Sequence, residues 1–329
     1  MKQPKIYNNV NELIDWLKYD LKEQRIEIAK GRGISKDDVK DEELVLHIGN
    51  KNYDFDPIDL LNQQNIKYNI YLNFNYILKK INNNKYILKV EGKNYQVCKY
   101  RINARHCIFN LGISTFNVIF EQELNFLKSS FSISNKQNND VGSHFAYCHF
   151  NNELIFKSCL LNANFTFVNC IFRNDAEFNC MKSNCKIDID FNNMFIKGAL
   201  LIANNTIENT INISFNNIFF DNSKSLLSIK DITNTIDSIS LKDVYVNGRI
   251  NIQNVKVDTV DFKGSVINGG LVNPVNFEVD KFANRESALF LKNEAYARNN
   301  VIDALEYKAK EIDLHRKKPK KRIIRRKKL

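Results

Sequence analysis

The chain has 329 residues, of which 43% are hydrophobic and 26% are charged, and its formal net charge is +11. This composition supports a folded core and excludes a disordered chain, while the length exceeds that of one ordinary compact domain. No apolar stretch reaches the roughly eighteen residues that a membrane helix needs, and the N-terminal residues form no apolar signal segment. We therefore predict a cytoplasmic protein of two or three units.

Composition changes along the chain. Nine of the 13 Tyr lie within residues 1–100, whereas most Phe and most Cys lie between residues 107 and 282. Asn is in excess, with 49 residues against 11 Gly and 4 Pro, and no Pro lies between Pro57 and Pro274. Because Asn tolerates left-handed backbone and Pro cannot donate to a strand ladder, this pattern predicts many chain corners between short, fully paired strands.

The first predicted unit covers residues 1–104 and has an α+β fold. Apolar spacing predicts an amphipathic helix over Val10–Ala29 that ends before Gly31. Residues 43–55 follow a strand–turn–strand pattern, Asp56 and Pro57 begin a helix, and residues 85–98 form a hairpin. The Gly31-Arg32-Gly33 stretch follows a helix and lacks the downstream residues of a phosphate-binding loop, so it marks a helix end.

The middle of the chain repeats. Small residues recur two positions before large apolar ones, as in Cys148-His149-Phe150, and three of the Cys residues are eleven apart. The segment Asp190–Phe195 returns almost unchanged at Ser214–Phe219, 24 residues later. This spacing predicts stacked coils of 20–24 residues. The side chains expected in their core are Cys107, Phe109, Cys148, Phe150, Cys159, Phe165, Cys170, Phe172, Phe178, Phe191, Phe215 and Phe262.

These repeats resemble those of the pentapeptide-repeat proteins, in which a small residue, a polar residue and a large apolar residue are followed by two polar positions. The resemblance covers residues 105–282 and is degenerate. It implies a mainly β fold, a right-handed four-sided β-solenoid in which the small and large residues both point inward. Between the small α+β N-terminal domain and a C-terminal amphipathic helix, such a solenoid would form the body of the protein.

Two groups of side chains are candidates for chemistry. The first is a possible metal cluster of His106, Cys107, His144, Cys148 and His149. The second is a possible carboxylate pair on the exterior of a β-helical enzyme, Asp188 and Asp190. The chain has no Cys-x-x-Cys pair, no phosphate-binding loop and no nucleophile motif. We therefore expect the Cys residues to fill core positions and the two Asp to lie on a solvated strand, and we predict no enzyme activity, metal or cofactor.

The third unit is a single amphipathic helix over residues 283–315, capped by Asn284. Its apolar face is expected to cover the open end of the last coil and to consist of Leu291, Ala295, Ile302, Leu305, Ala309 and Ile312. The stretch from Phe282 to Ala309 resembles a segment of bacterial pentapeptide-repeat-like membrane proteins. In those proteins, the helix joins a cytoplasmic solenoid to membrane helices, whereas here a basic run follows.

Residues 316–329 form that basic tail, which is predicted to be disordered. Ten cationic residues without an acid lie there, so the rest of the chain carries only +1. Three interpretations are open: an anchor to the anionic inner-membrane surface, a sequence-blind nucleic-acid contact, or the end of a truncated or frame-shifted gene product. The tail lacks interleaved aromatics, which disfavours nucleic acid. The candidate contacts are Arg316, Lys317, Lys318, Lys320, Lys321, Arg322, Arg325, Arg326, Lys327 and Lys328.

Taken together, the sequence predicts a non-enzymatic scaffold whose solenoid presents an extended face to a protein partner of unknown identity. Two alternatives stay open. One is a pentapeptide-repeat protein that interacts with nucleic acid or a topoisomerase, although mimicry of DNA requires a strongly acidic surface and the body is nearly neutral. The other is a protein held at a membrane surface by its basic tail.

Overall fold

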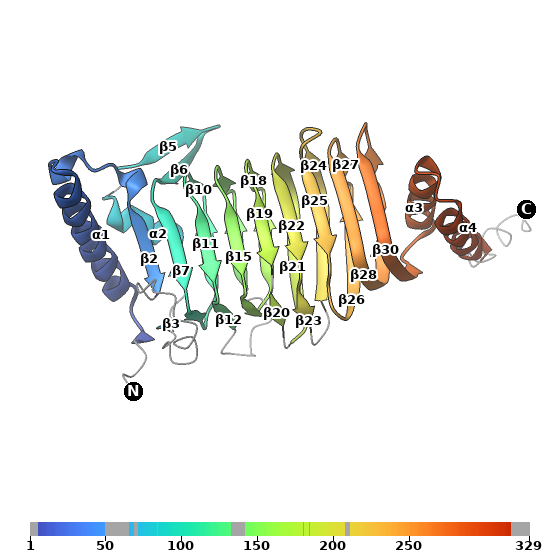
Figure 1. The fold of residues 1–329 in the computed structure, drawn as a ribbon, viewed down its shortest axis with the longest axis horizontal. Helices are drawn as coiled ribbons and strands as arrows, with labels where there is room; N and C mark the ends of the chain where they lie inside the picture. The colour runs from blue at the N-terminus through green and yellow to red at the C-terminus, as the bar shows by residue number, and fades with distance from the viewer. Residues whose placement is uncertain are drawn as a thin grey trace, which may run out of the picture.

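The computed structural model is an elongated rod, with helices at both ends of a long stack of short strands (Figure 1). Its stack is a parallel β-solenoid of about seven turns. The structure describes residues 6–49, 66–68, 72–83, 85–132, 142–179, 181–183, 185–207 and 211–316.

Successive coils place their strands on four parallel ladders. Ladder 1 contains β6 (Lys93–Cys98), β10 (Val118–Phe120), β14 (His149–Phe150), β18 (Ile171–Phe172), the second halves of β21 (Ile187–Ile196) and β24 (Ile211–Phe220), β27 (Tyr245–Val246) and β29 (Val266–Ile267). Ladder 2 contains β2 (Val45–Gly49), β7 (Arg101–Arg105), β11 (Leu124–Leu127), β15 (Leu154–Lys157), β19 (Ala176–Asn179), β22 (Ala199–Ala203), β25 (Leu226–Lys230), and the first halves of β28 (Arg249–Asp261) and β30 (Leu271–Phe282).

The remaining strands form the other two ladders. Ladder 3 contains β1 (Ile6–Tyr7), β3 (Ile66–Tyr68), β8 (Cys107–Phe109), β12 (Ser130–Ser132), β16 (Leu160–Asn162), β20 (Lys182–Ser183) and β23 (Thr206–Ile207). Ladder 4 contains β4 (Leu72–Asn73), β9 (Ile113–Phe116), β13 (Ser143–Ala146), β17 (Phe165–Val168), the first halves of β21 and β24, β26 (Thr235–Lys242), and the second halves of β28 and β30. Most coils contain 21–26 residues, close to the predicted 20–24.

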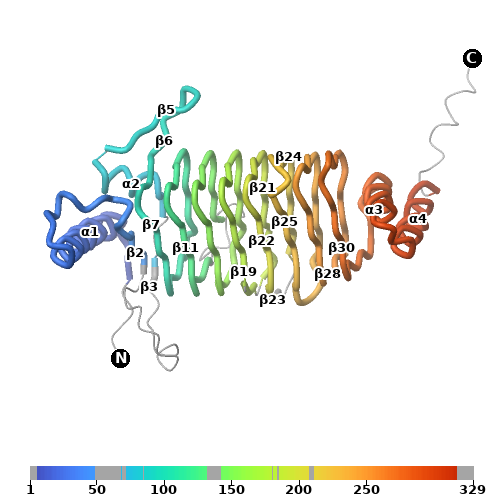
Figure 2. The backbone as a smooth tube through the Cα atoms, turned by 45° about the horizontal axis from the view of Figure 1, so that its top comes forward, coloured from blue at the N-terminus to red at the C-terminus, as the bar shows by residue number. Residues whose placement is uncertain are grey.

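The N-terminal region continues these ladders. Leu46 of β2 pairs with Ile102 of β7, which pairs with Leu124 of β11, so stacking extends to the N-terminal side of residue 105, the predicted start of the solenoid. Among the described residues, four helices complete this end: α1 (Val10–Arg32), the 3-10 helices η1 (Lys36–Asp38) and η2 (Asp41–Glu43), and α2 (Phe74–Ile81). In Figure 2, α1 lies across the end of the rod.

The helix predicted over residues 10–29 is confirmed and runs three residues further, to a cap at Gly33, whose φ of 65° is left-handed. The hairpin predicted over residues 85–98 is confirmed as β5 (Ile87–Val90) and β6. The strand at residues 53–55 and the helix start at Asp56 and Pro57 lie outside the described residues.

The predicted single C-terminal helix is wrong. Two helices, α3 (Arg285–Ala297) and α4 (Val301–Arg316), are separated by a turn in which Asn299 has a φ of 59°. Asn284 caps α3 as predicted, since its Oδ1 accepts from the Ser287 amide at 2.9 Å. The turn changes the direction of the chain, so the apolar residues of α4 do not continue the buried face of α3. Leu291 and Ala295 are buried, whereas the exposed positions are Ile302, Leu305, Ala309 and Ile312.

Aligned aromatic rings fill the interior. All twelve side chains expected in the core are at most 1% exposed. Within ladder 4, Phe167 stacks on Phe191 at 5.1 Å between ring centroids, and Phe191 stacks on Phe215 at 5.0 Å. Phe178 of ladder 2 meets Phe191 edge-on at 5.9 Å. Phe167 and Phe191 therefore each have stacked neighbours along the rod and an edge contact across it, two favourable aromatic geometries.

Asn occupies the corners, as its excess predicted. Most of the described non-glycine residues with positive φ are Asn, and Asn193 and Asn217 are two examples. Asn217 donates from Nδ2 to Oδ1 of Asn193 at 2.8 Å, directly between corresponding corners of two coils. The same side chain thus permits the left-handed turn and bonds the coils to one another.

Two phenylalanines of β24 provide a matched test of this core. Phe215 points inward and is fully buried, whereas Phe219 points outward and is 37% exposed. Phe215→Ala should lower the free energy of unfolding by about 3–5 kcal/mol, because it leaves a cavity in the column. Phe219→Ala should lower it by no more than about 1.5 kcal/mol. Urea denaturation followed by circular dichroism measures both, and equal losses would contradict the inward placement of Phe215.

Candidate interaction surfaces

One outward column of side chains runs the length of ladder 1. Corresponding strands are in register, so one outward position in each coil lies over the next. We call this set the ladder-1 column; its members are Val97, Ile119, His149, Ile171, Phe195, Phe219, Tyr245 and Val266. Seven of the eight are aliphatic or aromatic. An outward position of a solenoid normally faces water, so this composition marks the ladder as unusual.

The β5–β6 hairpin covers the N-terminal part of the column. Val97 and Ile119 are 8% and 5% exposed and form a small cluster with Tyr95, against which Tyr86 packs. The Tyr95 ring also lies 4.9 Å from the ring of His149. Burial, and to a lesser extent the charge of Arg173, lowers the pKa of His149, so this position is neutral at pH 7. The chain thus covers its own apolar column with a β-hairpin that carries tyrosines.

The C-terminal part of the column remains at the surface. Phe195 stacks on Phe219 at 5.3 Å, and Phe219 stacks on Tyr245 at 4.9 Å, which makes a continuous outward aromatic strip. Phe219 is 37% and Val266 is 53% exposed. Lys197 lies 5.4 Å from the centre of the Phe195 ring and provides a cationic margin to the strip.

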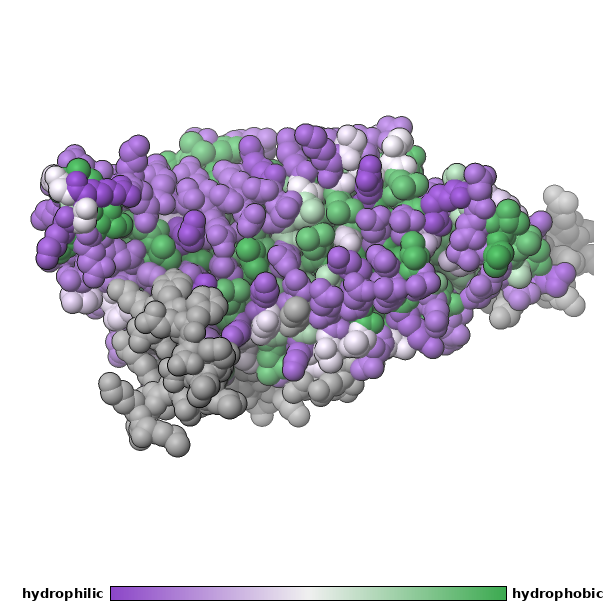
Figure 3. Space-filling view, viewed as in Figure 1, coloured by the Kyte–Doolittle hydropathy of each residue, from purple (hydrophilic) through white to green (hydrophobic). Residues whose placement is uncertain are grey.

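The neighbouring ladder 2 lacks such a strip. Its corresponding outward column mixes polar and apolar positions: Asn103, Asn125, Ile155, Glu177, Leu201, Ser228, Asn251 and Asn273. Figure 3 shows this side of the rod, where hydrophilic surface surrounds separate apolar patches. The continuous apolar column is therefore a property of ladder 1 and not of the whole solenoid surface.

The residues considered as a metal cluster point in different directions. Cys148 is fully buried, and its Sγ is 3.4 Å from the carbonyl oxygen of Ala146, whereas His149 lies on the outside. Cys107 likewise points inward, with its Sγ 3.0 Å from the carbonyl oxygen of Ile48. Within the described residues, no group of three or more His, Cys, Asp or Glu side chains is arranged to hold a metal ion. Cys180 lies outside the described residues.

The two aspartates considered as a carboxylate pair lie on the exterior of β21, in ladder 4. Asp188 accepts from Nδ2 of Asn212 at 2.8 Å, and Asp190 accepts from the hydroxyl of Ser214. Both donors come from the next coil, so each carboxylate bonds along the rod. This arrangement ties coils together and leaves the pair on a polar strand surface.

A buried polar cluster at the N-terminal end was not predicted from the sequence. Asp20 and Gln24 lie one turn apart on α1, and His47 lies on β2. Gln24 Nε2 donates to Asp20 Oδ2 and to the Val45 carbonyl, both at 2.8 Å, while His47 Nδ1 is 3.0 Å from Asp20 Oδ2. The cluster fastens α1 to β2. The sequence feature that could have indicated this cluster is the spacing of Asp20 and Gln24, two polar residues four apart on the apolar face of the helix.

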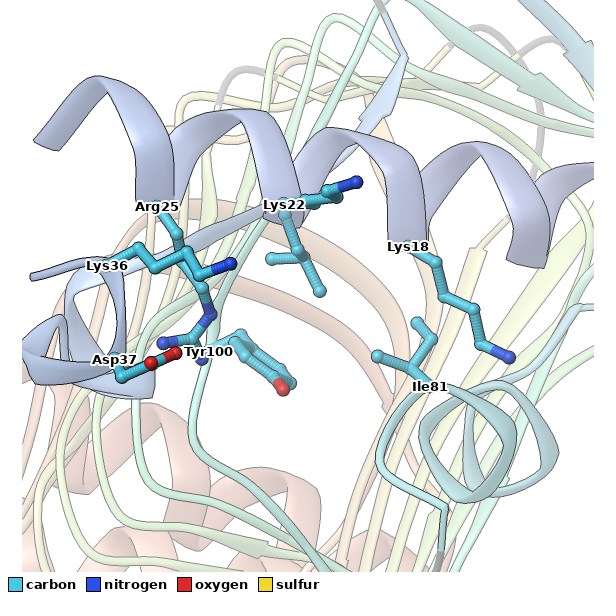
Figure 4. Close-up of a pocket in the computed structure, with 8 residues that line it drawn as sticks. Lys18, Lys22, Arg25, Lys36, Asp37, Ile81 and Tyr100 are labelled. Atoms are coloured by element: carbon cyan, nitrogen blue, oxygen red, sulfur yellow. The ribbon is translucent and has the colours of Figure 1, made fainter. Parts of the chain in front are cut away.

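A cavity of about 350 Å³ lies against α1 (Figure 4). Its lining is rich in cations and comprises Lys18, Leu21, Lys22, Arg25, Lys36, Asp37, Ile81 and Tyr100. Arg25 is already engaged, because it pairs with Asp41 and donates to the Val39 carbonyl at 2.5 Å. The hydroxyl of Tyr100 donates to Asn82 at 2.7 Å. The remaining lysines are exposed, so the cavity has positive charge without a fixed set of ligand-binding groups.

Of the ten cationic residues considered as an anionic-surface contact, only Arg316 lies in the described part of the chain, at the end of α4. Lys317 to Lys328 lie outside it. No helix among the described residues is both long enough and apolar enough to cross a membrane. Comparisons with protein-family models, with curated proteins and with solved structures gave no significant match.

Thiol reactivity tests whether the Cys residues are core side chains. Burial raises the pKa of Cys98 and of Cys159 to about 12 and raises the pKa of Cys148 well above its ordinary value. These thiols should stay protonated and unreactive in the native protein up to about pH 9, whereas half-exposed Cys185 should react. Brief iodoacetamide labelling with peptide mass spectrometry measures this, and labelling in urea is the control. Native labelling of Cys148 would contradict its burial.

Proposed function

We propose that this protein is a non-enzymatic scaffold that binds a protein partner along the ladder-1 column. The observation that carries the proposal is the outward aromatic strip of Phe195, Phe219 and Tyr245, continued by Val266. Phe219 and Val266 are exposed, and the other two side chains are half-buried. These outward side chains add less to folding than the inward columns, so their apolar character favours a role in binding. The five outward positions from Ile171 to Val266 extend over about 20 Å at the ordinary spacing between strands.

The partner surface that fits this strip is an extended segment or hairpin with aromatic or aliphatic side chains. The β5–β6 hairpin supports this choice, because Tyr95 and Tyr86 already cover the first part of the same column. Strands within ladder 1 have their backbone groups paired with the coils on either side. The partner would therefore bind through side chains, with Lys197 and Asp221 at the margin adding polar specificity.

We also propose that the solenoid is of the pentapeptide-repeat-like type. Four ladders, small inward residues such as Cys148 and Cys170, and large inward residues such as Phe150 support a degenerate pentapeptide-repeat-like solenoid. Six described cysteines are free and most are buried, which fits a reducing, cytoplasmic setting. DNA mimicry requires a strongly acidic surface, whereas the chain without its basic tail carries a net charge of +1, so the scaffold is the function that we favour.

Photo-crosslinking in the source cells tests the scaffold. A benzophenone amino acid at position 219 should give discrete adducts with a protein partner. The same group at Gln253, an exposed outward position of ladder 2, should give none above background. Both positions are outward and exposed, so a difference in crosslinking between them reports which ladder the partner contacts and not how accessible the position is.

A double variant distinguishes specific binding from non-specific hydrophobic association. Phe195→Lys with Tyr245→Lys places charges on either side of position 219, which should abolish the adducts while circular dichroism stays unchanged. Adducts that are equal at positions 219 and 253, or that persist in the double variant, would refute binding along the ladder-1 column.

A further inference from the structure

Helix α4 has an exposed apolar stripe that the solenoid does not use. Ile302 is 81%, Leu305 is 54% and Ile312 is 39% exposed, and the exposed Ala309 lies between them. Their spacing of three, four and three residues places all four on one side of the helix. We call these four residues the α4 stripe.

The opposite side of α4 is firmly docked. Tyr307 is 3% exposed and meets Phe282 of β30 edge-on at 5.8 Å. Glu311 pairs with Arg285 at 2.8 Å and with Lys292 at 2.6 Å, and the Lys292 hydrogen bond is the main cause of its lowered pKa. These contacts fix α4 on α3 and on the last coil, so the α4 stripe points away from the solenoid.

We propose that the α4 stripe binds the same stripe of a second copy of this chain, with the two helices parallel. Ile302 and Ala309 take the first apolar position of the heptad, and Leu305 and Ile312 take the second. A β-branched residue at the first position with Leu at the second favours two parallel strands, and the first heptad of α4 has this arrangement.

Charge supports the parallel direction. Lys308 and Asp313 flank the stripe on opposite sides, and neither makes an ion pair or hydrogen bond within the part of the chain that the structure describes. In a parallel pair, Lys308 faces Asp313 of the second copy, and the two-fold axis produces this pair twice. In an antiparallel pair, equivalent flanks of the two copies would face each other. Lys308 and His315 would then meet the same two residues of the second copy, and Glu306 and Asp313 would meet theirs, which places like charges together.

The fold also lowers the entropic cost of this pairing. Two heptads are too short to form a stable coiled coil from an unfolded peptide. Here α4 is already a helix, held by Tyr307 and Glu311, so association need not order it. Figures 1 and 2 place α4 at the far end of the rod, beyond α3. A partner that approaches the outer side of α4 therefore keeps its own solenoid clear of the first.

Sedimentation equilibrium of the full chain tests the pairing. Up to about 100 μM, the mass should rise from 38.4 kDa towards twice that value. Leu305→Glu should leave the protein monomeric, since Leu305 is exposed and its replacement does not disturb the core. Lys256→Asp, a charge change at an exposed solenoid position, should leave association unchanged. A wild-type chain that stays monomeric at the highest concentration would overturn the proposal.

Charge reversal tests the direction. Lys308→Asp alone, or Asp313→Lys alone, places like charges at both symmetric contacts and should raise the dimer dissociation constant about tenfold. The double variant restores opposite charges and should return the constant to within about threefold of wild type. A double variant that associates as weakly as the single variants, with circular dichroism confirming folding, would overturn the parallel arrangement.

Discussion

In-register stacking is the constraint on which the rest of this structure depends. Backbone hydrogen bonds between successive coils place each residue over its counterpart one coil away, as Phe191 lies over Phe215. Side chains of one kind that recur at the same position of each coil therefore form a column along the rod. Inward positions become aromatic columns, many corner positions are occupied by Asn, and the outward positions of ladder 1 form an apolar column, whereas those of ladder 2 are mixed.

This constraint separates the side chains that stabilise the core from those that face outward. The inward columns bury large side chains completely, and the buried thiols beside them are kept protonated by burial. Outward columns add less to the core, so their composition is free to vary between ladders. Ladder 4 has polar outward residues such as Asp190, bonded from coil to coil, whereas ladder 1 has Phe195 and Phe219. The same stacking therefore builds a polar side and an apolar side on one rod.

Much of the solenoid could be predicted because its signal is local and repeated. The small residue two places before a large one, as in Cys148 and Phe150, identified both inward positions, and the return of the Asp190 segment after 24 residues gave the coil length. The ladder-1 column was missed because Phe195 and Phe219 belong to that same repeat but lie on the opposite side of the strand. Only the register of neighbouring coils reveals that they stack outward. The break at Asn299 was missed because the apolar spacing passes through it without interruption.

The repeat formed by β21 and β24 has a consequence for the history of the chain. These two strands of ten residues pair in register from Ile187 with Ile211 to Ile196 with Phe220, 24 residues apart along the chain, and each offers the same ladders to the coil on either side. A duplication or loss of 24 residues there would preserve every neighbouring register and change the rod by about 4.8 Å. The molecule can thus evolve in length by whole coils, in discrete increments, while both helical ends keep the surfaces on which they rest.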